Sequence, residues 1–167
     1  MKSIITLIAI ILATTFGSQA QGGTIAVGYP AITGMNIDSK IATKLLRYEL
    51  IKLDLYSVYD EYDMKEAIAK DPSLQNECLS TNCLIKMGQE LKVDYTISGS
   101  IDKIGDMIVI NLKMIDVKSN KLHKTEMFEF ADQEDELQRM IAIVLRKMHD
   151  IETDATLVDR LEFKNDV

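Results

Sequence analysis

The sequence predicts an α+β fold, in which helices pack against a mixed five-stranded sheet in a two-layer α/β arrangement. Apolar and polar residues alternate over residues 93–102 and again over 108–114, as in half-buried strands. Residues 132–148 carry an apolar stripe at helical spacing, which predicts a C-terminal amphipathic helix. Near the N-terminus a strand, a helix and a strand follow closely, which favours a parallel crossover. The expected element order is therefore βαβααβββα.

The elements expected before the cysteines are, in order, strand 24–27, helix 39–53, strand 56–59 and helix 62–70. Gly28 and Pro30 break the first strand. The first helix has an apolar face containing Ala42, Leu46 and Leu50. Asp71-Pro72 ends the second helix, because the residue before a proline is biased away from helical backbone.

The elements expected after the cysteines are a helix starting near residue 83 and the strands 93–102, 108–114 and 122–130, then the final helix. Gly105-Asp106 and residues 118–121 supply the two turns between these strands. The last strand alternates less clearly and carries Lys124, Glu126 and Glu129. Such charges are typical of a strand at the edge of a sheet.

The first 20 residues predict a secretory signal peptide, with Lys2, an apolar run over residues 4–16 and cleavage after Ala20. The run is shorter than the ~18–20 residues that span a bilayer, so we expect no membrane insertion. No cysteine follows the run, so we expect no lipidation and a periplasmic or secreted protein. Residues 21–150 then form a single α/β domain. Residues 151–167 are an acidic tail, interpreted as a frayed end, with an extension of the last helix or a partner-docking segment as alternatives.

Cys78 and Cys83 are the only cysteines, and an even count in an exported chain favours a disulfide between them. Five helical steps advance about 7.5 Å, beyond the ~7 Å Cα limit of a disulfide. Cys78 is therefore expected in a loop, with Ser80, Thr81 or Asn82 capping the helix that follows. Free thiols, a zinc site and a redox pair are the alternatives, but zinc needs further ligands and a redox motif is normally C-x-x-C.

The residues needed for catalysis are sparse. The chain has no nucleophile, metal-binding or phosphate-loop motif of the common enzyme classes, so we expect no catalytic residues, no metal and no cofactor. The two histidines, His123 and His149, have no obvious partners in the sequence. A formal net charge of −7 disfavours nucleic acid and anionic lipid as partners.

Two groups of residues are candidates for binding a partner protein. The polar face of the meander carries Thr96 and Ser98, and an antiparallel sheet leaves such a face open. Tyrosines are favoured at interfaces, and four of them lie around the first helix and second strand: Tyr48, Tyr56, Tyr59 and Tyr62. The edge strand 122–130 is a further candidate, for pairing with a strand of another chain. An alternative hypothesis is a small-molecule or glycan site in the loop from Gly28 to Met35.

Several segments together resemble a family of bacterial envelope domains. They are TIAV, YSVYD, a C-x-x-x-x-C loop, LIKMGQEL, VDYTISGSI and IDVKSNK, within residues 24–148. The family is the periplasmic α/β domain shared by curli-secretion-channel-type proteins, the amino-terminal domain of the TolB translocation protein and lipoprotein activators of penicillin-binding proteins. The resemblance implies a non-catalytic adaptor that contacts another envelope protein. This chain lacks the lipidation cysteine and the long hairpins of some members.

Overall fold

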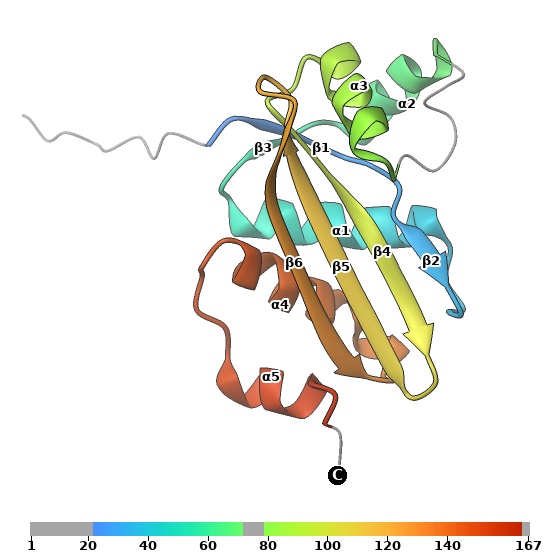
Figure 1. Cartoon of the computed structure of the whole chain (residues 1–167), viewed down its shortest axis with the longest axis vertical. Helices are drawn as coiled ribbons and strands as arrows, with labels where there is room; N and C mark the ends of the chain where they lie inside the picture. Colours follow the sequence, from blue (N-terminus) through green and yellow to red (C-terminus); the bar gives the residue numbers. More distant parts are fainter. Residues whose placement is uncertain (1–21, 72–78, 165–167) are drawn as a thin grey trace, which may run out of the picture.

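One mixed sheet organises the chain, and helices pack on both of its faces (Figure 1). The computed structural model describes residues 22–71 and 79–164. The strands are β1 (Thr24–Val27), β2 (Ala31–Thr33), β3 (Ser57–Val58), β4 (Tyr95–Ile104), β5 (Met107–Asp116) and β6 (Lys121–Ala131). Their order is β3-β1-β4-β5-β6, and β2 pairs with β4 next to β1.

The parallel and antiparallel pairings of the sheet agree with the expected fold class. β1 is parallel to β3 and to β4, while β4, β5 and β6 form an antiparallel meander. The parallel strand–helix–strand crossover and the edge position of β6 are confirmed. The sheet has six strands instead of five, because three residues of the loop from Gly28 to Met35 pair with β4 as β2.

The helices are α1 (Ser39–Leu53), α2 (Glu61–Ala69), α3 (Thr81–Leu91), α4 (Leu137–Met148) and α5 (Ala155–Leu161). Asp38 caps α1 by accepting a hydrogen bond from the Ile41 amide. Ser80, one of the three caps expected from the sequence, caps α3 by accepting from the Cys83 amide. The last long helix starts later than predicted, because Glu134–Glu136 first form a 3-10 turn, η2.

The main hydrophobic core lies between one face of the sheet and helices α1, α4 and α5 (Figure 1). Ile97, Ile110 and Leu112 point into it from the meander, and Leu46 comes from α1 and Val144 from α4. All five are 2% exposed or less. This face is the apolar half of the alternation seen in the sequence.

A second core lies on the opposite face, where α2 and α3 cover one end of the sheet. Thr96 and Ser98 lie beneath this cover with no exposed surface, so their assignment to an open binding face is wrong. Their hydroxyls donate to the carbonyl oxygens of Leu84 (3.2 Å) and Tyr29 (3.1 Å). A hydroxyl with such a partner can be buried at little cost.

Gly88 and Gly99 permit the close packing of this region. A Cβ at Gly88 would lie 2.3 Å from a methyl group of Val117, so only glycine lets α3 approach the sheet this closely. A Cβ at Gly99 would lie 1.8 Å from the Asn111 carbonyl oxygen on the neighbouring strand. Both glycines are required by contacts between distant parts of the chain.

The C-terminal segment differs from the frayed end interpreted from the sequence. Residues 155–161 form α5, a helix separate from α4, and Leu161 is completely buried in the main core. The amide of Phe163 donates to the Glu129 carbonyl oxygen at 3.1 Å, next to a bridge between Phe130 and Glu162. The segment therefore covers part of the edge of β6.

The predicted signal peptide and the predicted Cys78–Cys83 disulfide are not tested, because residues 1–20 and Cys78 lie outside the described residues. Cys83 lies in the first turn of α3.

Candidate partner-binding surface

The end of the meander that α2 and α3 leave uncovered exposes apolar side chains. Directly opposed residues of neighbouring strands point to the same face of the sheet. Ile104 is paired with Met107, and Met127 is paired with Asn111. These apolar side chains therefore lie on one face. Ile104 is 60% exposed and Met127 57% exposed, and Val109 between them is half-buried. We call Ile104, Met107, Val109 and Met127 the open-face patch.

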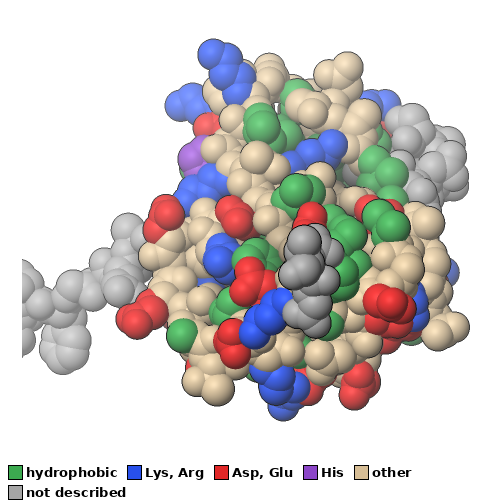
Figure 2. Space-filling view, turned by 60° about the horizontal axis from the view of Figure 1, so that its bottom comes forward, with side chains coloured by type: hydrophobic (Ala, Val, Ile, Leu, Met, Phe, Trp, Pro, Cys, Tyr) green, Lys and Arg blue, Asp and Glu red, His purple; other side chains and the backbone are tan. Residues whose placement is uncertain are grey.

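Polar and charged side chains border the open-face patch. Asp102 and Glu129 are paired with Val109 from either side, and Lys113 and Thr125 are paired with each other two rows nearer to α3. Figure 2 shows hydrophobic side chains reaching the surface among acidic and basic ones at this end of the molecule. An apolar patch with a polar rim is typical of a protein-interaction site.

The outer edge of β6 is a second feature of the same surface. Among the described residues no strand pairs with it beyond β5, apart from the bridge at Phe130. The segment after α5 covers the edge near Glu129, so the remaining part starts at Lys121. Unpaired backbone groups along such an edge can bind an extended segment of another chain.

The four candidate tyrosines do not form one surface. Tyr48 on α1 is 51% exposed and Tyr62 on α2 is 77% exposed. Tyr59 packs against the second core. Tyr56 is half-buried, and its hydroxyl lies 3.0 Å from Nε2 of His149. Only Tyr48 and Tyr62 keep the exposure that an interface residue needs.

His149 belongs to a cluster of rings that the sequence did not reveal. Its Nδ1 lies 2.8 Å from the Leu145 carbonyl oxygen, which can only accept, so Nδ1 carries the proton and Nε2 accepts from Tyr56. The Tyr95 ring meets the Tyr56 ring edge-on (5.6 Å between centroids) and lies tilted against His123 (5.0 Å). Burial lowers the pKa of His149 and raises the pKa of Tyr56. The cluster joins β3, β4, β6 and α4.

A polar hollow lies between α1 and α4. It has a volume of about 410 Å³ and is lined by polar groups that include Glu49 and Glu136. Glu49 accepts from Gln138 (2.6 Å) and pairs with Lys52. Hydrogen bonds from Arg139 and Arg160 lower the pKa of Glu136. A general acid needs a raised pKa, and the ion pairs of Glu136 act in the opposite direction.

Metal-binding and membrane-spanning features are absent from the part of the chain that the structure describes. Residues 22–71 and 79–164 contain no cluster of three or more His, Cys, Asp or Glu side chains arranged to hold a metal ion. None of the described helices has the length and apolarity of a bilayer-spanning helix.

The sequence contains a signal for the open-face patch, but the signal lies within a strand whose regular alternation of apolar and polar residues makes it easy to miss. Residues 107–110 read Met-Ile-Val-Ile, so both phases of the strand are apolar at this point. A continuous apolar run is typical of a strand that is covered on both faces. Here the second face, with Met107 and Val109, is only half-buried.

Comparisons with known proteins identify the fold and a family match. A family model described as the second domain of HilA/YgeH-like transcriptional regulators matches residues 36–146. The C-terminal domain of LpoB from Salmonella enterica has a TM-score of 0.57 and 14% identity, over 65% of this chain and 82% of that one. The same domain from Escherichia coli has a TM-score of 0.55 and 14% identity, with the same coverages.

A chain of the PelC dodecamer from Paraburkholderia phytofirmans has a TM-score of 0.50 and 15% identity, over 77% of this chain and 90% of that one. At these identities the similarity concerns the fold alone. It confirms, at that level, the resemblance to the periplasmic α/β domain family. Among curated proteins, none matches the sequence.

Proposed function

The chain belongs to the family of HilA/YgeH-like transcriptional regulator second domains, and on that premise we propose that it is a non-enzymatic module that binds another protein. The observation that carries this proposal is the open-face patch, where Ile104 and Met127 expose more than half of their surface. When a partner covers apolar side chains that lie together on one sheet face, their removal from water favours binding.

The partner that we propose is another protein of the bacterial envelope. The predicted signal peptide, residues 1–20, would deliver the chain to the periplasm or outside the cell. Asp102, Glu129 and Lys113 around the patch would orient the partner, since charges at an interface contribute mainly to specificity.

The family description refers to transcriptional regulators, so DNA is the alternative partner that our proposal has to exclude. The net charge of −7 opposes binding to a duplex, because affinity for DNA comes largely from neutralised phosphates. Asp102 and Glu129 on the open sheet face add repulsion there. A chain that binds a DNA duplex at physiological salt would contradict our proposal.

The alternative function, ligand binding through the loop from Gly28 to Met35, has weaker support. Residues 31–33 of this loop are strand β2, and the Gly28 amide donates to the Ile97 carbonyl oxygen at 2.8 Å. Most of the backbone that would hold a ligand is therefore used by the sheet. Tyr29 also lines a small cavity, although its carbonyl oxygen accepts from the Ser98 hydroxyl.

The test is site-specific photocrosslinking in the cells that produce the protein. A photoreactive residue at Ile104 should give a discrete crosslinked protein, and a second substitution, Met127→Glu, should abolish it by placing a charge in the interface. Tyr62→Glu on α2 is the matched control and should leave the crosslink intact. A crosslink that persists with Met127→Glu, or that Tyr62→Glu also removes, would overturn the assignment to the open-face patch.

A further inference from the structure

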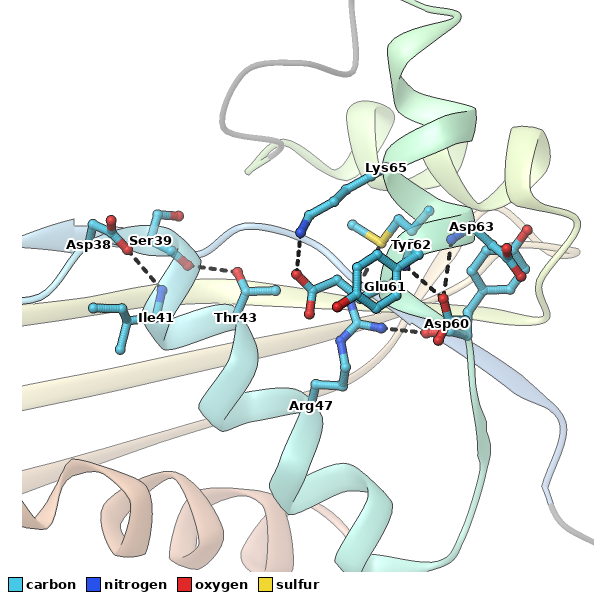
Figure 3. A network of polar contacts seen from close by, with 12 residues as sticks. Asp38, Ser39, Ile41, Thr43, Arg47, Asp60, Glu61, Tyr62, Asp63 and Lys65 are labelled. Atoms are coloured by element: carbon cyan, nitrogen blue, oxygen red, sulfur yellow. Dashed lines mark hydrogen bonds and ion pairs between the residues drawn. The ribbon is translucent and has the colours of Figure 1, made fainter.

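A small cavity between α1 and α2 gathers positive charge in a chain that is negative overall. Its volume is about 90 Å³. Lys40, Lys44 and Arg47 line it from one face of α1, at spacings of four and three residues. Lys65 lines it from α2, and Glu61 is the one carboxylate among its lining residues. Figure 3 shows Arg47, Glu61 and Lys65 converging at this junction.

Arg47 forms the floor of the cavity and is only 6% exposed. Its Nη1 donates to the Tyr59 carbonyl oxygen, and its Nη2 lies 3.8 Å from the sulfur of Met64. Its Nε is buried without a hydrogen-bond partner among the described residues. A buried donor of this kind is normally satisfied by a protein group, a water or a ligand.

The charge of Arg47 is not balanced by an ion pair among the residues that the structure describes. Burial lowers the pKa of Arg47, while Glu61 and Asp60 oppose that effect through space. The Glu61 carboxylate is held by Lys65 at 2.6 Å, and this hydrogen bond keeps the pKa of Glu61 low. Asp60 caps α2 by accepting from the amides of Tyr62 and Asp63. Both acids are therefore engaged elsewhere.

The mouth of the cavity carries further cations. Lys40 and Lys44 are exposed, and neither forms an ion pair within residues 22–71 and 79–164. The Thr43 hydroxyl donates its proton to the Ser39 carbonyl oxygen at 2.7 Å and keeps only acceptor capacity. A cation at the floor and two at the mouth form a site whose charge is complementary to an anion.

We propose that this cavity binds a phosphate-class oxyanion, with the guanidinium group of Arg47 at its floor and Lys40 and Lys44 at its mouth. A water takes roughly 30 Å³ of liquid volume, so the cavity has room for one small polyatomic group. A larger ligand needs about 300–1,000 Å³. The oxyanion is thus free phosphate or the phosphoryl group of a molecule whose remainder stays outside. The proposal is independent of the open-face patch, because no residue of that patch lines the cavity.

The first test is an NMR titration of the exported chain with inorganic phosphate, monitoring the Nε–Hε resonance of Arg47, with affinity measured by calorimetry. Lys44→Gln should weaken binding about tenfold, as expected for a lost charged hydrogen bond. Lys118→Gln makes the same charge change in the exposed β5–β6 turn and should leave the affinity unchanged. Because Lys44 is exposed, its substitution should not disturb the fold.

Arg47→Lys tests the floor, because it keeps the charge and removes the planar guanidinium group. We expect no phosphate binding by this variant when circular dichroism shows that it is folded. Glycerol 3-phosphate separates the two sources: tighter binding than phosphate indicates a phosphoryl headgroup, and equal binding indicates free phosphate.

Two results would overturn the site. One is an Arg47 resonance that does not shift with phosphate in the unmodified chain, and the other is equal weakening by Lys44→Gln and Lys118→Gln. Met127→Glu should not change phosphate binding, so the failure of one proposal can be told from the failure of the other.

Discussion

The two faces of the sheet are built from the same strands and differ in what covers them. Among the described residues, α1, α4 and α5 cover twenty buried apolar residues in a continuous core on one face. On the other face α2 and α3 cover nine of the described residues, all near one end, and the side chains of the open-face patch keep exposed surface. The first face therefore holds the domain together. The second is divided between structure and a surface available for binding.

The largest effect should come from the fully covered face. Phe130 on β6 is completely buried in the main core, and Phe130→Ala should lower the free energy of unfolding by about 3–5 kcal/mol. Urea denaturation followed by circular dichroism measures this value. A loss below about 1 kcal/mol would mean that the main core does not depend on β6, and it would contradict the claim that this face holds the domain together.

The second core should respond less and more locally. Leu84 on α3 is completely buried, and Leu84→Ala should cost about 2–3 kcal/mol. This cluster is small, with nine buried residues among those described. We therefore expect Leu84→Ala to speed amide hydrogen exchange in α2 and α3, while the amides of α1 and α4 stay protected. Uniformly faster exchange over the whole sheet would show that the two cores unfold as one unit.

A change of pH should have a smaller effect on the free energy of unfolding, through the cluster of rings around His149. Burial lowers the pKa of His149 below its unfolded value of 6.5, and repulsion from Lys124 and His123 adds to this effect. The hydrogen bond to the Leu145 carbonyl oxygen and, more weakly, the charge of Asp150 oppose it. The unfolded state therefore binds the proton more strongly. Stability is complete above pH 6.5 and decreases as the pH falls below it toward the folded-state pKa.

The measurement for His149 is the free energy of unfolding between about pH 8 and about pH 5.5, in the unmodified chain and in His149→Gln. Glutamine can still accept from Tyr56 but does not titrate, so the variant should lose this part of the pH dependence. Parallel pH profiles of the two proteins would assign the dependence to other groups.

The smallest effect on stability should come from the open-face patch. Met127→Lys changes an exposed side chain, so we expect the free energy of unfolding to stay within about 0.5 kcal/mol. The same substitution should prevent partner crosslinking at Ile104. A large loss of stability would show that the patch is part of the core instead of a binding surface.

Much of the architecture can be predicted because it follows from local patterns. The bounds Ser39–Leu53 of α1 follow from an apolar helical face and the Asp38 cap. Alternation with a period of two predicts β4 and β5, and the charges of β6 predict its edge position. The late start of α4 and the extra strand β2 escape prediction, since both are short features with little signal in the sequence.

The candidate site is predicted less well. Alternation places Thr96 and Ser98 correctly on the face opposite the main core. It does not show that α3 covers them, because that depends on Gly88 meeting Val117, two residues far apart in the chain. The basic spacing of Lys40, Lys44 and Arg47 is visible in α1, but nothing local shows that α2 closes over it.

The sequence by itself determined the order of the main elements, without β2 and α5, together with their apolar faces, the parallel crossover and the absence of the common catalytic motifs. Each of these depends on residues that are close in the chain or repeat at a fixed period. The tertiary structure alone decided which side of the sheet each helix covers, which apolar residues stay exposed and which cations meet in the cavity. These features depend on packing between distant segments, and packing is set by side-chain volume and backbone approach that no local pattern records.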